Sequence, residues 1–369
     1  MGEACDDASM PADRPVIASV GTALGPFSYP QHEITAAFGA LVTPDPRDRA
    51  RLERFHAATG VLTRHLALPL AEYPELAGFG AANDAFLRVG VDLAQAAVTD
   101  ALQHAGLEAA DVDLVMTVTV TGIAAPGLEA RLVPRIGLRD DVRRLPVFGL
   151  GCVAGAAGVA RVADYLEGHP DGVAVLLSVE LCSLTVQRDD ASPANLVASG
   201  LFGDGAAAVV MVGQRRAVAM GISARGPTVI DSRSRLYPDT ERVMGWDVGG
   251  SGFRVVLAPT VADVVEQHLG DDVKGFLAHH DLDISDVDRW IAHPGGPKVL
   301  QAMARTLGRP DDAFALTWQS LAEVGNLSSS SVLHVLARTL ERFPPGDQRP
   351  ALLMAMGPGF CSELVLLRW

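Results

Sequence analysis

Continuous apolar runs alternate with longer periodic stretches along most of the chain. The apolar runs predict strands that are buried on both faces, at residues 114–120, 173–179, 206–212, 290–292 and 352–356. The periodic stretches between them predict helices, at residues 89–105, 154–168, 261–279 and 332–342. This alternation predicts an α/β protein in which helices and sheets form layers.

Two segments of the first half recur in the second half. HAGLEAADVD from His104 resembles HHDLDISDVD from His279, and each copy runs into an apolar strand. Further along, LGCVAGAAGVARVADYL aligns with VGNLSSSSVLHVLARTL at nearly the same shift, which places Cys152 on Asn326. Two matches in register indicate a duplicated α/β unit. If the halves pack about a pseudo-two-fold axis, the turns that carry Cys152 and Asn326 meet at its centre, beside the strand end that carries His293.

The duplication also predicts the domain organisation. We expect a disordered leader at residues 1–14, a first half at residues 15–220 that contains Cys152, and a second half at residues 221–369 that contains His293 and Asn326.

Composition and charge narrow the class of protein. The chain has 369 residues, of which 49% are hydrophobic and 20% charged, as is typical of globular proteins. Its net charge of −14 disfavours nucleic acid or an anionic membrane as a partner. No apolar run is long enough to span a membrane, and the polar, acidic start lacks signal-peptide features, so we expect a cytoplasmic protein. The four cysteines show neither metal-ligand spacing nor a disulfide pattern.

Cys152 occupies the position best suited to a nucleophile. It follows the apolar run LPVF and precedes a helix of small residues, and Gly149 and Gly151 flank it with backbone freedom. A thiol at a helix start lies near unsatisfied N–H groups and the positive end of the helix dipole, which predicts a lowered pKa. The alternative is an inert core cysteine, since free cysteines are among the most buried residues.

His293 and Asn326 supply the polar groups that such a nucleophile needs. His293 ends a strand, because Pro294 in IAHPGGP cannot continue a ladder, although an isolated histidine is more often structural. Asn326 precedes LSSSSVL and could be a simple helix cap. A cysteine protease uses such a trio. In acyl transfer from a thioester, His and Asn instead donate to the enolate that forms when a malonyl group loses CO2.

The motifs FGLGCVAG, LFGDGAAA, IAHPGGP, GNLSSSSVL and MGPGF together resemble those of type III polyketide synthases. These enzymes are the chalcone-synthase-like branch of the thiolase superfamily, and the resemblance covers about residues 15–369. It implies a thiolase-like fold with duplicated halves in a layered αβαβα architecture. It further implies a homodimeric acyltransferase that uses acyl-CoA and malonyl-CoA as substrates, without a metal or another cofactor.

The resemblance also implies roles for individual residues. Cys152 would take the starter acyl group, and His293 would keep the thiolate ionised and, with Asn326, bind the malonyl thioester oxygen. Phe202 would be the gate between the CoA tunnel and the cavity. The other cavity residues would be Val120, Cys182, Thr185, Met244, Phe253 and Ser328. CoA would contact Arg51, Arg54 and Lys298, whereas a third basic position of plant members is Ala58 here.

The expected product follows from the cavity. Cys182 in SVELCSLT resembles bacterial members that make alkylpyrones or alkylresorcinols, and Met244 should shrink the space for a bulky aromatic starter. We therefore expect condensation of an aliphatic acyl-CoA with malonyl-CoA and release of a cyclised alkylpyrone or alkylresorcinol. Alternatives are a tetrahydroxynaphthalene synthase that uses malonyl-CoA only, a ketoacyl-carrier-protein synthase III-like enzyme, and a catalytically silent partner subunit of the same fold.

Overall fold

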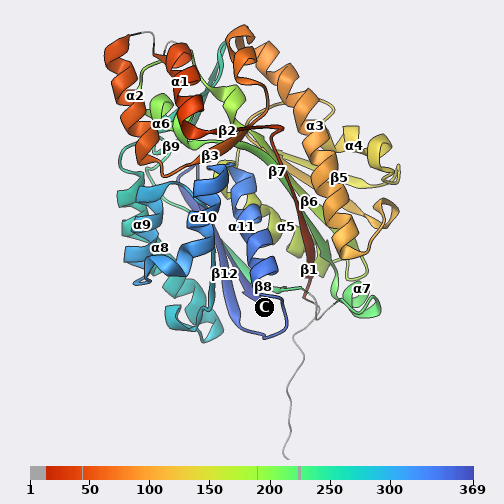
Figure 1. Cartoon of the computed structure of the whole chain (residues 1–369). Helices are drawn as coiled ribbons and strands as arrows, with labels where there is room; N and C mark the ends of the chain where they lie inside the picture. The colour runs from red at the N-terminus through yellow and green to blue at the C-terminus, as the bar shows by residue number, and fades with distance from the viewer. Residues whose placement is uncertain (1–13, 44, 189, 223–225) are drawn as a thin grey trace, which may run out of the picture.

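A continuous ladder of strands forms the centre of the molecule (Figure 1). The computed structural model describes residues 14–43, 45–188, 190–222 and 226–369. Within them, nine strands are ordered β11-β12-β13-β8-β1-β7-β6-β4-β5. Their bounds are β1 Val16–Leu24, β4 Leu114–Thr119, β5 Arg143–Phe148, β6 Val173–Leu181, β7 Asp204–Val212, β8 Thr228–Leu236, β11 Arg289–Ala292, β12 Pro350–Gly357 and β13 Cys361–Arg368.

Helices and two small two-stranded sheets surround this ladder. The α-helices are α1 Gln31–Val42, α2 Pro46–Ala58, α3 Gly78–Ala105, α4 Leu128–Ile136, α5 Ala154–Glu167, α6 Pro193–Leu201, α7 Gln214–Ala219, α8 Val261–Leu277, α9 Pro297–Thr306, α10 Ala315–Val324 and α11 Ser329–Arg342. One small sheet pairs β2 Phe27–Pro30 with β3 Thr63–Leu66, and the other is a hairpin of β9 Met244–Gly249 and β10 Gly252–Leu257. None of the described helices is both long and apolar enough to cross a membrane.

The predicted duplication is confirmed by the strand topology. The order β1-β7-β6-β4 in the first half repeats as β8-β13-β12-β11 in the second. The pairing repeats as well: β7 is antiparallel to β1 and β6, β13 is antiparallel to β8 and β12, and β4 and β11 are parallel to β6 and β12. The halves join where Val16 of β1 pairs with Thr228 of β8. Among the ladder strands of the described chain, only β5 has no counterpart in the second half.

The elements form the five layers of the expected αβαβα architecture. Helix α3 covers the outer face of the first half, α8 and α9 cover the outer face of the second, and α5 and α11 lie between them (Figure 1). The apolar run of strand β7 is continuous because both faces of the strand are covered by helices. Ala206, Ala208 and Val210 pack on the α3 side, whereas Ala207 and Val209 pack on the α5 and α11 side.

Small residues bring the two halves close together at the centre. A Cβ added to Gly155 of α5 would lie 2.3 Å from the Ser329 carbonyl oxygen at the start of α11. Helix α11 begins three residues before the predicted start, because the buried hydroxyls of Ser329 and Ser330 are satisfied by Ser178 Oγ at 2.8 and 2.7 Å. Serines that usually favour a loop are thus stabilised inside a helix by tertiary contacts.

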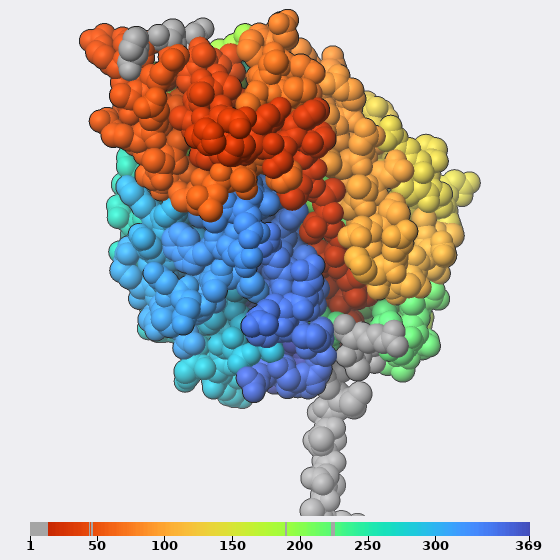
Figure 2. All heavy atoms as spheres, viewed as in Figure 1, coloured from red at the N-terminus to blue at the C-terminus, as the bar shows by residue number. Residues whose placement is uncertain are grey.

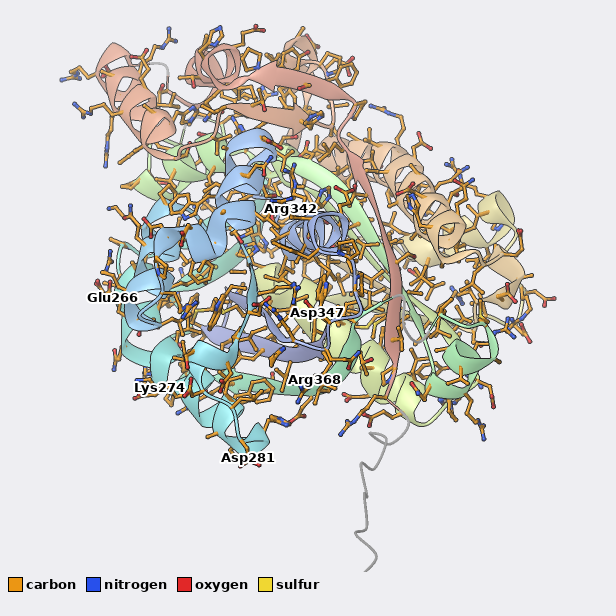
Figure 3. All side chains as sticks on the ribbon, turned by 60° about the horizontal axis from the view of Figure 1, so that its bottom comes forward. Glu266, Lys274, Asp281, Arg342, Asp347 and Arg368 are labelled. Carbon is orange, nitrogen blue, oxygen red and sulfur yellow. The ribbon has the colours of Figure 1, made fainter. Side chains whose placement is uncertain are left out.

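The N-terminal part of the first half extends over the second. Residues of α1, α2 and β3, red to orange, lie directly above the blue C-terminal elements in Figure 2. The Leu62 N–H donates to the Ala322 carbonyl at the contact between them, at 2.8 Å. On the outer face of the second half, Glu266 and Lys274 of α8 and the nearby Asp281 point away from the molecule (Figure 3). The opposite face of α8 buries Val265 and Leu269, as expected for an amphipathic helix.

Residues 1–13 of the predicted leader lie outside the described residues. The boundary between residues 220 and 221 remains a prediction.

Candidate active site

Cys152 lies in a tight turn, Gly151–Val153, that connects β5 to α5. Its side chain is buried, with 7% of the residue exposed. Gly151 has φ +62°, and a Cβ there would lie 2.5 Å from Cγ of Pro358. Gly357 likewise packs against the backbone nitrogens of Cys152 and Val153. Gly151 is therefore required both by the backbone conformation and by the close approach of Pro358, in the turn that precedes β13.

The expectation of a lowered pKa for the Cys152 thiol is wrong. The position at the helix start predicts a lowered value, but burial raises the pKa of the thiol to about 12, and the neighbouring Glu180 carboxyl raises it further. The Ser328 hydroxyl acts in the opposite direction by hydrogen bonding. Desolvation of the charged form outweighs the favourable helix terminus, so the thiol is protonated at neutral pH in the free chain.

Asn326 has a fixed orientation. Its Oδ1 accepts a hydrogen bond from the Ser328 N–H at 2.8 Å and lies 3.4 Å from Ser331 Oγ. The amide nitrogen Nδ2 is therefore directed the other way, where it lies 3.4 Å from His293 Nε2. With the imidazole proton on Nε2, both side chains can donate to a single oxygen atom placed between them. Two fixed N–H donors of this kind stabilise an oxyanion.

His293 directly follows β11, as predicted, and its N–H donates to the Met354 carbonyl at 2.9 Å. Burial lowers the pKa of its imidazole to about 3. The ring is therefore neutral at neutral pH in the free chain, and its role in keeping Cys152 ionised stays a prediction. A neutral imidazole can accept the thiol proton, which leaves a thiolate. Its Nδ1 is buried and has no hydrogen-bond partner among the described residues.

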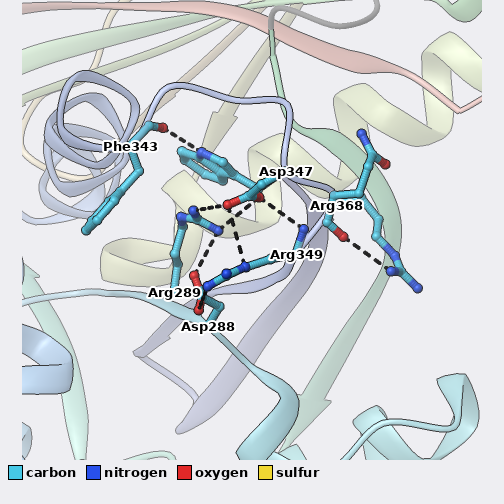
Figure 4. Close-up of polar contacts among 8 residues, drawn as sticks. Asp288, Arg289, Phe343, Asp347, Arg349 and Arg368 are labelled. Carbon is cyan, nitrogen blue, oxygen red and sulfur yellow. Dashed lines mark hydrogen bonds and ion pairs between the residues drawn. The ribbon is translucent and has the colours of Figure 1, made fainter.

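The strand that carries His293 is anchored at its start by Arg289 (Figure 4). The guanidinium, with 8% of the residue exposed, lies between the carboxylates of Asp288 and Asp347. It also stacks over the rings of Phe343 and Trp369, at 5.2 and 5.3 Å from their centroids. Strand β11 is the last strand at this edge of the ladder and pairs only with β12. The contacts of Arg289 therefore stabilise a strand that has a hydrogen-bonded neighbour on one side only.

Phe202, the predicted gate residue, is joined to Asn326 by backbone pairing. The Asn326 N–H donates to the Leu201 carbonyl at 2.9 Å, and the Gly203 N–H donates to the Asn326 carbonyl at 3.0 Å. The buried Arg64 donates to the Phe202 carbonyl at 2.7 Å. The structure therefore places this phenylalanine next to the Asn326 turn, although its role as a gate stays a prediction.

The remaining predicted cavity residues form a second group. Val120 and Cys182 are buried, and the Cys182 carbonyl accepts a hydrogen bond from Thr185 Oγ1 at 2.7 Å. Gln187 Nε2 connects Thr185 to Phe253 by donating to the carbonyl of each, at 3.0 and 3.2 Å.

Phe253 is the centre of an aromatic cluster. It packs against the rings of Phe79, Phe148 and Trp246, at centroid distances of 5.1, 5.8 and 6.1 Å. Met244 is half-buried at the start of β9, and no polar contact among the described residues joins it or Phe253 to Cys152. The structure therefore connects Ser328 directly to Cys152, whereas Asn326, His293 and Phe202 are joined to Ser328 by hydrogen bonds and backbone pairing around Asn326.

Glu180 is a buried residue of the site that the sequence analysis missed. It lies in β6, where Thr121 Oγ1 and the Val120 N–H donate to Oε2 at 2.8 and 3.1 Å, and Ser329 Oγ donates to Oε1. Burial raises the pKa of its carboxyl to about 7. The signal was present in the sequence: a lone acidic residue within the apolar run VAVLLSVEL is seldom buried without a specific set of partners.

The predicted CoA contacts lie on the surface. Arg51 and Arg54 are on α2, where the Arg51 guanidinium lies 5.6 Å from the Phe55 ring centroid and Arg54 is exposed. Lys298 is exposed in the first turn of α9. Gly60, just after α2, lies close to the start of α9: a Cβ added to Gly60 would lie 3.8 Å from Cγ of Pro297. CoA binding by these three residues stays a prediction. Among the described residues no cluster of three His, Cys, Asp or Glu side chains could hold a metal ion.

Both halves of the chain match known proteins. Residues 5–215 match the model of the N-terminal domain of chalcone and stilbene synthases, and residues 229–369 match that of the C-terminal domain. The 1,3,6,8-tetrahydroxynaphthalene synthase of Streptomyces peucetius subsp. caesius is 55% identical over 96% of this chain and 93% of its own. The solved tetrahydroxynaphthalene synthase of Streptomyces coelicolor A3(2) is 30% identical, with a TM-score of 0.89 over 96% and 99% of the chains. PKS-I of the brown alga Ectocarpus siliculosus is 25% identical, with a TM-score of 0.91 over 98% and 99%.

Proposed function

The chain belongs to the chalcone and stilbene synthase family, the type III polyketide synthases, which are acyltransferases, and we propose that it builds a hydroxylated naphthalene from malonyl-CoA alone. The observation that carries this proposal is the 55% identity, over nearly the full length of both chains, to a 1,3,6,8-tetrahydroxynaphthalene synthase. The alkylpyrone or alkylresorcinol product expected from Cys182 has no comparable support.

The named product is consistent with malonyl-CoA as the sole substrate. A folded chain of five two-carbon ketide units carries oxygen on every second carbon, at ring positions 1, 3, 6, 8 and 4a, and the oxygen at position 4a leaves as water when the ring closes. The ten ring carbons correspond to five such units, each supplied by a malonyl group that loses one CO2. Five malonyl-CoA thus give one tetrahydroxynaphthalene, five CO2, five CoA and one water.

Loading begins at Cys152. The neutral His293 imidazole accepts the thiol proton, the sulfur attacks the malonyl thioester carbonyl, and the proton then passes to the departing CoA thiolate. A general base is needed because burial holds the pKa of this thiol at about 12. Burial keeps the His293 ring neutral, so one of its nitrogens has a lone pair that can accept the proton.

Extension uses the two fixed N–H donors. The thioester oxygen of a second malonyl-CoA lies between His293 Nε2 and Asn326 Nδ2, which stabilise the enolate left by loss of CO2. The enolate carbon attacks the Cys152 thioester, a carbon–carbon bond forms, and the Cys152 sulfur leaves. The hydrogen bond from Ser328 to Oδ1 prevents the Asn326 amide from presenting an acceptor to this negative charge.

We also propose that the protein is a homodimer that associates through β5. This strand is at the edge of the ladder and pairs only with β4 among the described strands. Leu145 and Phe148 of β5 are 46% and 48% exposed, and the nearby Ile123 is 47% exposed. An exposed apolar edge strand is a site of self-association, and two-fold symmetric pairing would cover it. Replacement of Leu145 and Phe148 by lysine should then give a monomer by light scattering, and an unchanged mass would refute the β5 interface.

The experiment for the proposed activity supplies malonyl-CoA alone, and in parallel with acyl-CoA starters from C2 to C18. Products are read by liquid chromatography and mass spectrometry beside Cys152→Ala. We expect an aromatic product from malonyl-CoA alone that is absent from the variant. A product only in the presence of an acyl-CoA would refute the proposal in favour of alkylpyrone or alkylresorcinol formation. No product and no CO2 release would favour the silent partner subunit.

A further inference from the structure

Ser328 is at the N-cap position of α11, yet its side chain makes no cap hydrogen bond. Serine at this position normally accepts a hydrogen bond from a backbone N–H of its own helix. Here Oγ lies instead 3.7 Å from Sγ of Cys152, within hydrogen-bonding range of sulfur. The hydroxyl has no other polar partner among the described residues. The helix therefore forgoes a local stabilising contact, and the hydroxyl is directed at the nucleophile.

The backbone of Ser328 also has an unusual conformation. Its φ is +49° and its ψ is −127°, a conformation that residues with a Cβ rarely adopt. Its N–H donates to Asn326 Oδ1, and Ser331 donates its N–H to the Ser328 carbonyl at 3.1 Å. These contacts hold the strained conformation. One residue thus orients the oxyanion donor through its backbone and contacts the thiol through its side chain.

We propose that Ser328 is a positioning residue for the nucleophile: its hydroxyl donates to the Cys152 thiolate, stabilises it and holds the sulfur toward the donor pair. The catalytic meaning of this contact rests on the proposed function, but the contact itself does not. A hydrogen bond to the charged form of a group favours that form. Burial opposes ionisation of Cys152, so a donor at the sulfur has a large effect on how readily the thiolate forms.

Other groups around Cys152 cannot take this role. The Glu180 carboxyl of β6 raises the pKa of the thiol, as does the Cys361 thiol of β13. Cys182 is itself buried with a strongly raised pKa, so its neutral thiol has no positive charge that could stabilise the Cys152 thiolate. The His293 imidazole has a different task in the proposed reaction, where it accepts the thiol proton, and its Nε2 lies 3.4 Å from Asn326 Nδ2. The Ser328 hydroxyl is the side-chain hydrogen-bonding partner of Sγ among the described residues.

The test measures alkylation of Cys152 by iodoacetamide against pH, with the modified peptide quantified by mass spectrometry so that other thiols do not contribute. The variants are Ser328→Ala and Ser328→Gly. Glycine removes the hydroxyl and also relieves the positive φ. The matched control is Ser330→Ala, which removes a neighbouring buried hydroxyl that bonds to Ser178 and not to Cys152. Circular dichroism and thermal unfolding report whether each variant is folded.

We expect both Ser328 variants to shift the alkylation midpoint upward by about one pH unit, roughly a tenfold lower rate at neutral pH. Ser330→Ala should leave the midpoint in place, and Ser328→Gly should unfold at a temperature equal to or above that of the wild type. An unmoved midpoint in both Ser328 variants overturns the proposal. A shift in Ser328→Ala that is absent in Ser328→Gly also overturns it, since the cause would then be backbone strain.

Failure of this inference is distinguishable from failure of the proposed function. A shifted midpoint in a protein that forms no polyketide would retain the Ser328 contact and refute the synthase activity. Polyketide formation with an unmoved midpoint would refute the Ser328 contact alone.

Discussion

The backbone N–H of Ser328 donates a 2.8 Å hydrogen bond to Oδ1 of Asn326 and thereby turns the amide nitrogen toward His293. One contact within a three-residue turn thus decides whether Asn326 presents a donor or an acceptor. The wrong orientation would place a partial negative charge where the enolate forms. The geometry of this turn is therefore as important to the proposed chemistry as the identity of the side chain.

Replacing Asn326 by aspartate tests this assignment. Aspartate keeps an oxygen that accepts from the Ser328 N–H but loses the Nδ2 donor and adds a negative charge. We expect the rate of malonyl-CoA decarboxylation to fall at least about a hundredfold, the usual effect of losing one oxyanion donor. Thermal unfolding should change little because the turn is preserved. A variant that is folded and keeps half of the wild-type rate would contradict the donor role.

The Gly151 turn makes a prediction about stability. Gly151→Ala should lower the free energy of unfolding by about 2–4 kcal/mol, because alanine at φ +62° is strained and its Cβ meets Pro358. Gly149→Ala is the matched variant: its φ is +104°, but no atom lies within 4 Å of the added Cβ. It should lose only about 1–2 kcal/mol by urea denaturation. Equal losses would show that the contact with Pro358 does not affect the free energy of unfolding.

The buried Glu180 carboxyl predicts a pH-dependent stability. Its pKa is about 7 in the fold against an ordinary value of 4.5, so between these values the folded protein binds more protons than the unfolded chain. The free energy of unfolding should therefore decrease as pH rises from about 4.5 to 7 and then level off, by up to about 3 kcal/mol for this group.

Glu180→Gln isolates that contribution, since all other groups are shared with the wild type. The difference in unfolding free energy between variant and wild type, measured in urea, should favour the variant more at pH 8 than at pH 5. Asp204, whose buried carboxyl has a pKa of about 6, contributes equally to both proteins. Parallel pH profiles of the two proteins would refute the perturbed titration of Glu180.

Substitution of the surface arginines tests the CoA contacts. Arg51→Glu and Arg54→Glu should each raise the KM for malonyl-CoA by about tenfold with kcat nearly unchanged, because a charge-assisted contact to phosphate is lost. The effect should shrink in high salt. The control is Arg215→Glu on α7, where the arginine pairs with Asp171. A change in kcat at constant KM, or an equal effect of Arg215→Glu, would contradict phosphate binding by α2.

The duplication was the most informative feature of the sequence. The alignment of Cys152 with Asn326 predicted equivalent turns, and the strand orders of the two halves repeat accordingly. Burial was harder to predict, because it depends on contacts between residues far apart in the chain. Ser329 and Glu180 are 149 positions apart, and their contact appears only when α11 packs on β6. For the same reason the sequence predicted a lowered pKa for Cys152, whereas the surrounding protein raises it.

In the proposed reaction every ring carbon of the product comes from malonyl-CoA. The direct test supplies uniformly 13C-labelled malonyl-CoA together with unlabelled acyl-CoA starters and determines the mass of the product. We expect an aromatic product in which all ten ring carbons are labelled, and no product from Cys152→Ala. A product that retains an unlabelled acyl chain would contradict it.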